Sequence, residues 1–377
     1  MARTARPLVE MAREAGWVVD VIDLFGDEDT RRAARTTTAL TPDRFFDFDA
    51  GTLLGAVAAQ QCLSGPAMVV VGSGFERAPA ALARLARDYR VLGCDAEVYH
   101  RLRDLPAFFE LLRRREGISS PTTQWQPPPA GAGWLRKQVG GSGGYHVTVL
   151  TGSAQATRGS YFQRRHSGHS RSALFIANGR ECRYYGCAEH LRWHARAGYR
   201  YEGARRLPQV SAQARAALER IGAVLTARLG LRGCFGIDFL ASEERAPVLL
   251  DINPRPTATL ELWPDRQRMF DAHIAACTDQ TLLYSSPQVA SQRAHLVLYA
   301  DAAWTATDQL SWPTWVADRP CRGTFIARGA PLCTVQGEAA DDDALLTQLT
   351  QRYDALRVLL GAQAQAVLPP AINIRIM

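Results

Sequence analysis

The run Trp134-Leu135-Arg136-Lys137-Gln138-Val139 leads directly into Gly140-Gly141-Ser142-Gly143-Gly144, and this junction is the most informative part of the chain. Lys137 is the single lysine among the 44 Lys and Arg residues, so arginine serves nearly everywhere else that a cation is needed. Lysine is a compact charge on a flexible stem, whereas arginine is a wide planar fork. Because a glycine-rich loop lets backbone N–H groups approach anionic oxygens closely, the junction predicts a strand followed by a phosphate-binding loop. The alternative is a chance surface lysine beside a flexible turn.

The composition indicates a soluble globular protein of two or three domains. The chain has 377 residues, of which 47% are hydrophobic and 21% are charged. No apolar run is long enough to span a membrane, and the first residues lack the apolar core of a signal peptide, so we expect a cytoplasmic protein with no membrane partner. The eight cysteines include no CxxC pair, which favours reduced thiols over disulfides or a zinc ribbon.

The net charge of +7 is spread along the chain rather than gathered on one segment. A nucleic-acid-binding protein would need a dense basic face or a known binding module, and the sequence has neither. We therefore expect no nucleic-acid partner, and interpret the charge as a mild attraction for anionic ligands.

Strands and helices alternate in the first hundred residues, which predicts a parallel sheet and an α/β fold. Strands are expected over 17–25, 67–71 and 89–92, with a helix over 79–88. A helix over 8–15 precedes all of them, although a domain of this type normally begins with a strand. Either that first strand is absent or it is supplied from elsewhere in the fold.

The remaining chain mixes strands and helices in an α+β manner. Helices are predicted over 105–116, 211–229 and 341–360, and strands over 134–139, 145–151, 160–164, 172–176, 234–240 and 247–252. We divide the chain into an N-terminal domain over 1–100, a lysine and glycine-loop subdomain over 101–180, and a C-terminal metal-binding domain with an extension over 181–377.

Acidic side chains interrupt the two apolar strands that follow the 211–229 helix. Asp238 lies in the first strand, and Asp251 and Asn253, two residues apart, point to the same side of the second. Two neighbouring antiparallel strands could bring all three onto one face. Carboxylate and amide oxygens are hard ligands suited to Mg²⁺, and buried carboxylates are costly unless a cation neutralises them. The alternative is an ion pair with Arg255 or other arginines.

The order of these features resembles the ATP-grasp superfamily of carboxylate–amine ligases over nearly the whole chain. The resemblance implies an ATP-grasp fold with a Rossmann-like N-terminal (pre-ATP-grasp) domain that lacks a clear first strand. It further implies that ATP binds with Mg²⁺, or Mn²⁺ in its place, and that Asp238, Asp251 and Asn253 hold the metal. Lys137 would contact the α- and β-phosphates, and Arg255 would stabilise the transferring phosphoryl group. Cofactor contacts would come from Gly140, Gly141, Ser142, Gly143 and Gly144, which close over the phosphates, and from Gln163, Arg164, Arg165 and His166, whose backbone meets the adenine.

Two departures from the family pattern stand out. Members usually carry a second lysine near the 105–116 helix; this chain has none, so Arg101 or Arg103 could take its place. Members also use an acidic residue of the hinge for the ribose, and this chain has no Asp or Glu between Gln163 and Gly179.

Outer segments are similar to a narrower group, the tyramine–glutamate ligases of methanofuran synthesis. These segments are 23–31, 72–76, 253–262, 317–320 and 331–335. The alternative is that they are packing features of many ATP-grasp subgroups. Glu76 could bind the substrate amine, with a charge near a helix N-terminus as the alternative. Thr257, Thr259 and Glu261 could line the acceptor pocket, with a solvated turn as the alternative.

The function implied is an ADP-forming ligase that joins a carboxylate to an amine through an acyl phosphate. The carboxylate is expected to be glutamate, and the amine is expected to be tyramine or tyrosine. The pathway would be one-carbon cofactor biosynthesis. Its partners would be small-molecule carboxylate and amine substrates, with a homodimer as a compatible assembly. Two alternatives stay open: a catalytically impaired ATP-binding regulatory or scaffold protein, and an ATP-grasp enzyme that activates bicarbonate.

Overall fold

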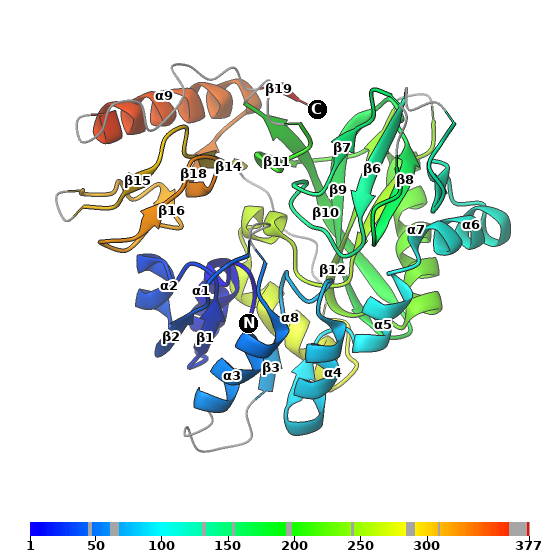
Figure 1. Ribbon diagram of the computed structural model, residues 1–377, viewed down its shortest axis with the longest axis horizontal. Coiled ribbons are helices and arrows are strands. Elements are labelled where there is room, and N and C mark those ends of the chain that lie inside the picture. Colours follow the sequence, from blue (N-terminus) through cyan, green and yellow to red (C-terminus); the bar gives the residue numbers. More distant parts are fainter. Residues whose placement is uncertain are drawn as a thin grey trace.

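A computed structural model describes residues 1–43, 47–60, 68–129, 133–152, 155–193, 198–242, 245–283, 291–307, 310–361 and 375–376 (Figure 1). Its first hundred residues form a small parallel α/β unit, as the alternation predicts. The strands are β1 (Asp20–Asp23), β2 (Thr36–Ala39), β3 (Met68–Val70) and β4 (Arg90–Leu92), paired β1–β2 and β3–β4. The helices are α1 (Arg6–Glu14), α2 (Glu28–Ala33), α3 (Ala50–Gln60), α4 (Pro79–Asp88) and α5 (Ala96–Arg101). The predicted strand over 67–71 begins at a residue outside the described ranges.

No strand is assigned before α1 among the described residues, as predicted, but residues 1–3 form backbone hydrogen bonds where a first strand would lie. The nitrogen of Met1 donates to the carbonyl oxygen of Val70, and Gly72 N–H donates to the carbonyl of Met1, both at 2.8 Å. On the other side, Ala2 N–H donates to the carbonyl of Ile22 at 3.2 Å. Residues 1–3 therefore connect the two separate strand pairs by backbone hydrogen bonds. Three residues are too few to show a hydrophobic period, so the sequence pattern could not reveal them.

The lysine subdomain is a four-stranded antiparallel sheet that follows helix α6 (Leu105–Glu116). Its order is β5-β8-β6-β7, with β5 (Thr123–Gln124), β6 (Trp134–Gln138), β7 (Thr148–Val149) and β8 (Ser160–Arg164). The predicted strand over 145–151 is shortened to β7, since Val147 N–H bonds back to the carbonyl of Gly144 at 3.1 Å in a turn.

A large antiparallel sheet forms the centre of the molecule and runs on to the C-terminal helix (Figure 1). Its order is β13-β12-β9-β10-β11-β14-β18-β16, and β19 (Arg375–Ile376) pairs with β10. Its strands are β9 (His169–Asn178), β10 (Cys182–Arg192), β11 (Gly203–Leu207), β12 (Arg232–Ala241), β13 (Val248–Asn253), β14 (Gln292–Tyr299), β16 (Val316–Ala317) and β18 (Pro331–Ala339). The other elements are α7 (Ala212–Leu229), the 3-10 helix η1 (Ala258–Leu262), α8 (Arg266–Thr278), the β15–β17 pair (Trp304–Thr305, Phe325–Ile326) and α9 (Asp342–Gly361).

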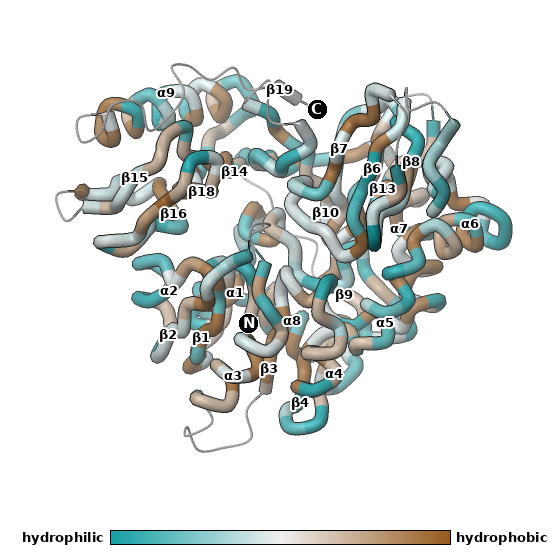
Figure 2. The backbone as a smooth tube through the Cα atoms, viewed as in Figure 1, coloured by the Kyte–Doolittle hydropathy of each residue, from teal (hydrophilic) through white to brown (hydrophobic). Residues whose placement is uncertain are grey.

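Helices α6, α7 and α9 lie within one residue of their predicted bounds because their apolar stripes and end signals agree, whereas α3 and α8 were not predicted. In α7, the Ser211 hydroxyl accepts from Ala214 N–H at 3.2 Å, and Gly230 ends the helix at φ 71°. Figure 2 shows hydrophobic and hydrophilic residues alternating along α9. Its apolar stripe is completely buried in a core with strands β14 and β18; the stripe is Leu345, Leu349, Tyr353, Leu356 and Leu360.

Within the described ranges, no helix is long and apolar enough to cross a membrane. The seven cysteines described there are free thiols, as the absence of paired spacings predicts.

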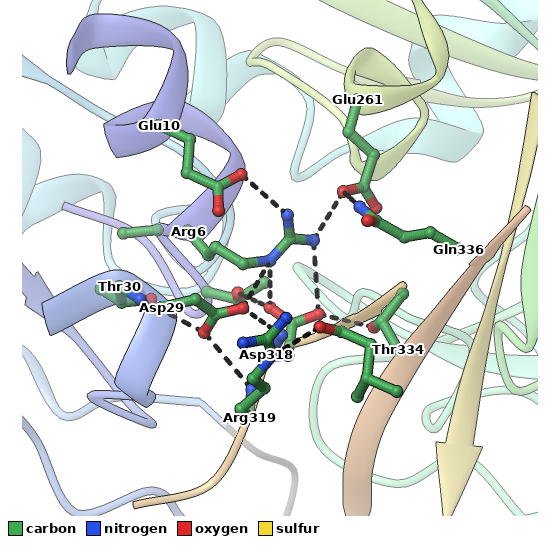
Figure 3. A network of polar contacts seen from close by, with 12 residues as sticks. Arg6, Glu10, Asp29, Thr30, Glu261, Asp318, Arg319, Thr334 and Gln336 are labelled. Carbon is green, nitrogen blue, oxygen red and sulfur yellow. Dashed lines mark hydrogen bonds and ion pairs between the residues drawn. The ribbon is translucent and has the colours of Figure 1, made fainter. Parts of the chain in front are cut away.

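Arg6 holds the N-terminal unit to the C-terminal strands (Figure 3). Its side chain is 1% exposed and bonds to Asp318 at 2.7 Å, Glu261 at 2.6 Å and Glu10 at 3.2 Å. These carboxylates come from a loop before β18, from η1 and from α1. One buried guanidinium therefore neutralises acids from three elements that are far apart in the sequence.

Replacing Arg6 by methionine should destabilise the protein by about 3–5 kcal/mol, since removing one partner of a buried ion pair leaves the other charges uncompensated. The midpoint of urea unfolding measures this. Arg35→Met is the control: it breaks an ion pair with Asp20 in which the arginine is half-exposed, and exposed pairs contribute little. Equal changes of the midpoint in the two variants would contradict a special role for Arg6.

Candidate functional site

A cavity of about 1120 Å³ lies where the N-terminal unit, the lysine subdomain and the large sheet meet. Fifteen of the eighteen predicted site residues line it, although they span more than a hundred positions of sequence. They are Lys137, Ser142, Gly143, Gly144, Gln163, Arg164, Arg165, His166, Asp238, Asp251, Asn253, Arg255, Thr257, Thr259 and Glu261. The other three, Glu76, Gly140 and Gly141, line a smaller cavity of about 40 Å³, whose wall also includes Asp251 and Asn253.

Lys137 is a buried cation without a hydrogen-bonding partner among the described residues. It lies on β6 opposite Tyr161 of β8 and is 8% exposed. Burial lowers the pKa of its ammonium group, while the charges of Asp251 and Asp238 oppose that shift. A buried charge with no partner is costly unless a ligand completes it. The surface-lysine alternative therefore does not apply, and the position suits a bound anion.

The loop after Lys137 lines this cavity with residues 142–144, and it has no room for side chains at Gly140 and Gly144. Gly140 has φ 70°, and a Cβ there would lie 2.6 Å from the carbonyl oxygen of Glu76. Gly144 has φ 76°, and a Cβ would overlap with the carbonyl of Tyr199. The Ser142 hydroxyl accepts a hydrogen bond from Arg3, which ties the loop to the N-terminal unit. Glycine is thus required here by positive φ and by close packing.

The acidic residues meet on one face of β12 and β13, as the antiparallel pairing predicts. Asp238 lies directly opposite Asp251, and Asn253 pairs with Gly236. The amide of Asn253 donates to Asp238 at 3.2 Å. Burial raises the pKa of Asp251 to about 6, although Lys137 opposes the shift. Among the described residues, neither aspartate forms an ion pair with an arginine, so the arginine alternative is not supported.

The same face offers hard oxygen donors but does not enclose a metal ion. Within the described ranges, no group of three or more His, Cys, Asp or Glu side chains is arranged to hold one. The donor set is two carboxylates and the Asn253 amide. Mg²⁺ keeps few protein ligands and takes the remainder from water and phosphate oxygens, so this set fits Mg²⁺ that arrives with a nucleotide.

Glu76 is placed differently from the prediction that it binds the substrate amine. One of its oxygens accepts from Arg255 Nε at 2.5 Å, and the other accepts from Gly74 N–H at 2.7 Å. Burial opposes ionisation of Glu76, but the Arg255 charge and these hydrogen bonds keep its pKa below the ordinary value. Glu76 is also absent from the large cavity. Its carboxylate therefore orients Arg255, whose Nη2 also donates to Asn253 at 3.1 Å.

The segment predicted to meet adenine through its backbone uses two of its N–H groups within the protein. Arg164 N–H donates to the carbonyl of Thr122, and Arg165 N–H donates to the carbonyl of Gly133, both at 2.8 Å. The Gln163 side chain is buried and reaches the carbonyl of Leu250 at 3.4 Å. Contacts to a base would therefore have to come from other atoms of this segment.

Of the two arginines suggested as substitutes for the second lysine, Arg103 lies in the wall of the smaller cavity beside Gly140 and Gly141. Arg101 is exposed and lines neither cavity. Arg103 is thus the better candidate of the two.

The cavity also contains residues that motif analysis missed. His146 is one: burial and the nearby Lys137 lower its pKa to about 3, so the imidazole is neutral. Asp27 and Asp318 are two more, and they form another part of the wall together with Glu261, which was predicted to line the acceptor pocket. The last three lie in the outer segments 23–31, 253–262 and 317–320, so the resemblance of those segments was the available signal.

Comparisons with known proteins agree with this architecture. Residues 106–259 match the family model described as ATP-grasp domain. No curated protein matches the sequence.

Three solved structures are similar over nearly their full lengths. A carboxyaminoimidazole ribonucleotide synthase from Aspergillus clavatus, complexed with ATP, has a TM-score of 0.68 and 15% identity, covering 95% of this chain and 97% of its own. Biotin carboxylase from Campylobacter jejuni has a TM-score of 0.67 and 11% identity, covering 98% and 90%. The biotin carboxylase domain dimer of 2-oxoglutarate carboxylase from Hydrogenobacter thermophilus, in complex with MgADP and bicarbonate, has a TM-score of 0.66 and 11% identity, covering 98% and 89%.

Proposed function

This chain has the ATP-grasp fold and carries an ATP-grasp domain over residues 106–259, and we propose that it is an ATP-dependent, ADP-forming carboxylate–amine ligase. The observation that carries the proposal is the position of Lys137. Lys137 is a buried cation next to a glycine loop, no described residue forms a hydrogen bond with it, and it shares its cavity with the Asp238, Asp251 and Asn253 face. A cation, a loop of N–H groups and a set of hard oxygen donors are what a metal–nucleotide complex requires.

Each group has a part in this activity. Lys137 and the glycine loop would bind the phosphates of ATP, and the Asp238, Asp251 and Asn253 face would hold Mg²⁺. The metal, when bound, neutralises charge on the terminal phosphates. Arg255, fixed by Glu76, would stabilise the phosphoryl group in transfer, since this chemistry depends on positioning and charge neutralisation. The substrate carboxylate becomes an acyl phosphate with release of ADP, and the amine then displaces phosphate to form the amide.

The substrates we propose are glutamate and tyramine or tyrosine, in a methanofuran-like pathway. Support comes from the outer segments of the sequence and from Thr257 and Thr259, which line the cavity with their hydroxyls 3.0 Å apart. A bicarbonate-activating enzyme is the second candidate, because a structural neighbour was solved in complex with bicarbonate. That neighbour is also a dimer, which supports a homodimer here.

We expect ADP release from Mg-ATP only when glutamate and tyramine (or tyrosine) are both present. The product mass should equal the sum of the two substrates less one water. Coupled ADP detection followed by mass analysis tests this, with a bicarbonate arm in parallel. ADP release that needs bicarbonate instead would favour the second candidate. Saturable ATP binding without turnover under any condition would favour the regulatory or scaffold alternative.

A further inference from the structure

The wall of the large cavity opposite the phosphate-binding loop is acidic. Asp27, Glu261 and Asp318 line it, and Glu10 and Asp29 lie behind them; we call these five residues the acidic wall. They come from α1, from α2 and the residue before it, from η1 and from the loop before β18. Figure 3 shows most of the wall gathered around Arg6.

Four of the five acids are satisfied by groups of the protein. Glu10, Glu261 and Asp318 bond to Arg6. Glu261 also lies 2.9 Å from His295 Nδ1, and Glu10 pairs with Arg266 at 2.8 Å.

Asp29 and Asp318 are further tied to the backbone and to a hydroxyl. Asp29 accepts from the N–H groups of Asp318 at 2.7 Å and Arg319 at 3.3 Å. Asp318 accepts from the Thr334 hydroxyl at 2.5 Å. Arg6, Arg266 and the other groups named above therefore already bind these four acids.

Asp27 is the exception. Its side chain is 5% exposed, it lines the cavity, and no described residue forms a hydrogen bond or an ion pair with its carboxylate. Burial raises its pKa well above the ordinary value, and the charges of Asp318, Asp23 and Asp29 raise it further, whereas Arg6 opposes the shift. A buried carboxylate among other acids requires either a proton or a cationic ligand.

The surroundings favour an organic cation over a metal ion. The described residues contain no group of His, Cys, Asp and Glu side chains arranged to hold a metal. Apolar side chains line the same cavity on both sides of Asp27 in the sequence: Leu24, Phe25 and Pro42. An alkyl- or arylammonium ion can place its charge on a carboxylate and its carbon skeleton against such a surface, whereas a hydrated metal ion gains nothing from it.

We propose that the acidic wall, through Asp27, binds the ammonium group of the acceptor substrate, which is therefore a primary amine. This inference rests on the proposed ligase function and names the substrate class of its acceptor site. It places the two substrates by charge: phosphates and carboxylates lie toward Lys137 and Arg255, and the amine lies toward α2. The overall positive charge of the chain gives no hint of this local acidic surface.

Binding should be measured directly, with probe pairs that differ only in the charged group. Tyramine is compared with 4-ethylphenol, and butylamine with 1-butanol, by isothermal titration calorimetry on the wild type, Asp27→Asn and Glu28→Gln. Glu28 is the matched control because it is the next residue and is exposed. We expect the wild type to bind at least one amine at least tenfold more tightly than its neutral partner. Asp27→Asn should lose at least tenfold in affinity for that amine, and Glu28→Gln should bind it as the wild type does.

ATP titration of the same samples shows that each variant is folded. The wild type alone can overturn the proposal. It does so if it binds amines and their neutral partners with equal affinity, or if it binds neither. Unchanged amine binding in Asp27→Asn would also overturn it, since Asp27 would then be a protonated structural group. These measurements require no turnover, so absence of ADP release alongside Asp27-dependent amine binding would count against the ligase and not against the amine site.

Discussion

Lys137→Arg is expected to lower the kcat/KM for ADP formation by about 10³-fold, although it preserves the charge. Losses of this size are seen when a group that stabilises charge in the transition state is removed. The ammonium of Lys137 sits in a buried position beneath the loop at 140–144 and beside Asp251. A guanidinium is wider and planar, and its donors have fixed directions. The loop leaves little room for it, because Gly140 and Gly144 pack closely against the carbonyls of Glu76 and Tyr199.

Arg136→Lys is the matched control for this experiment. It makes the reverse exchange one residue earlier on β6, where the side chain points to the other face of the strand. We expect it to retain nearly full activity. Wild-type kinetics in Lys137→Arg would show that the site requires only a positive charge, and would remove the argument drawn from the single lysine.

Asp251→Asn is expected to raise the Mg²⁺ concentration needed for half-maximal ADP release by about 10²-fold and leave the fold intact. The exchange keeps the size of the side chain but removes one of the two carboxylates on the β12–β13 face. Mg²⁺ prefers charged oxygen ligands, so its affinity should fall. The loss of a buried negative charge whose pKa is already raised should also cost the folded state little.

The metal dependence of this variant can be measured in two ways. One measurement is the rate of ADP release as the Mg²⁺ concentration is varied at a fixed ATP concentration. The other is Mn²⁺ binding in the presence of ADP, detected by electron paramagnetic resonance. Asp88→Asn, on the exposed end of α4, should leave both unchanged. If Asp251→Asn had the metal dependence of the wild type, Asp251 would be excluded from the metal site.

The predicted helices and strands are present in the structure, but the prediction also missed several long elements, among them α3, α8, β10, β14 and β18. The bounds of α4, α6 and β8 agree with prediction, and those of α7 and α9 differ by one residue. Residues 1–3 and the short strands β15 to β17 are too brief to show a period. Their positions are set by pairing with strands far away in the chain, which no local window contains.

Short-range relations in the sequence predict most of the proposed phosphate- and metal-binding face. Lys137 and its loop are adjacent in sequence, and Asp251 and Asn253 share a side because strand residues alternate. The pairing of Asp238 with Asp251 follows from two strands joined by a short connection, part of which lies outside the described residues. These relations involve neighbours, so the residue order alone determined them.

The tertiary structure decided which charges meet. It turned Glu76 from an expected substrate ligand into the partner of Arg255, and it gathered Glu10, Glu261 and Asp318 around Arg6. It also placed the Asp27 carboxylate in the same cavity as Lys137, with no hydrogen-bond or ion-pair partner among the described residues. The physical reason is that the free energy of a buried charge depends on what lies within a few ångströms of it, and those neighbours come from segments separated by hundreds of residues.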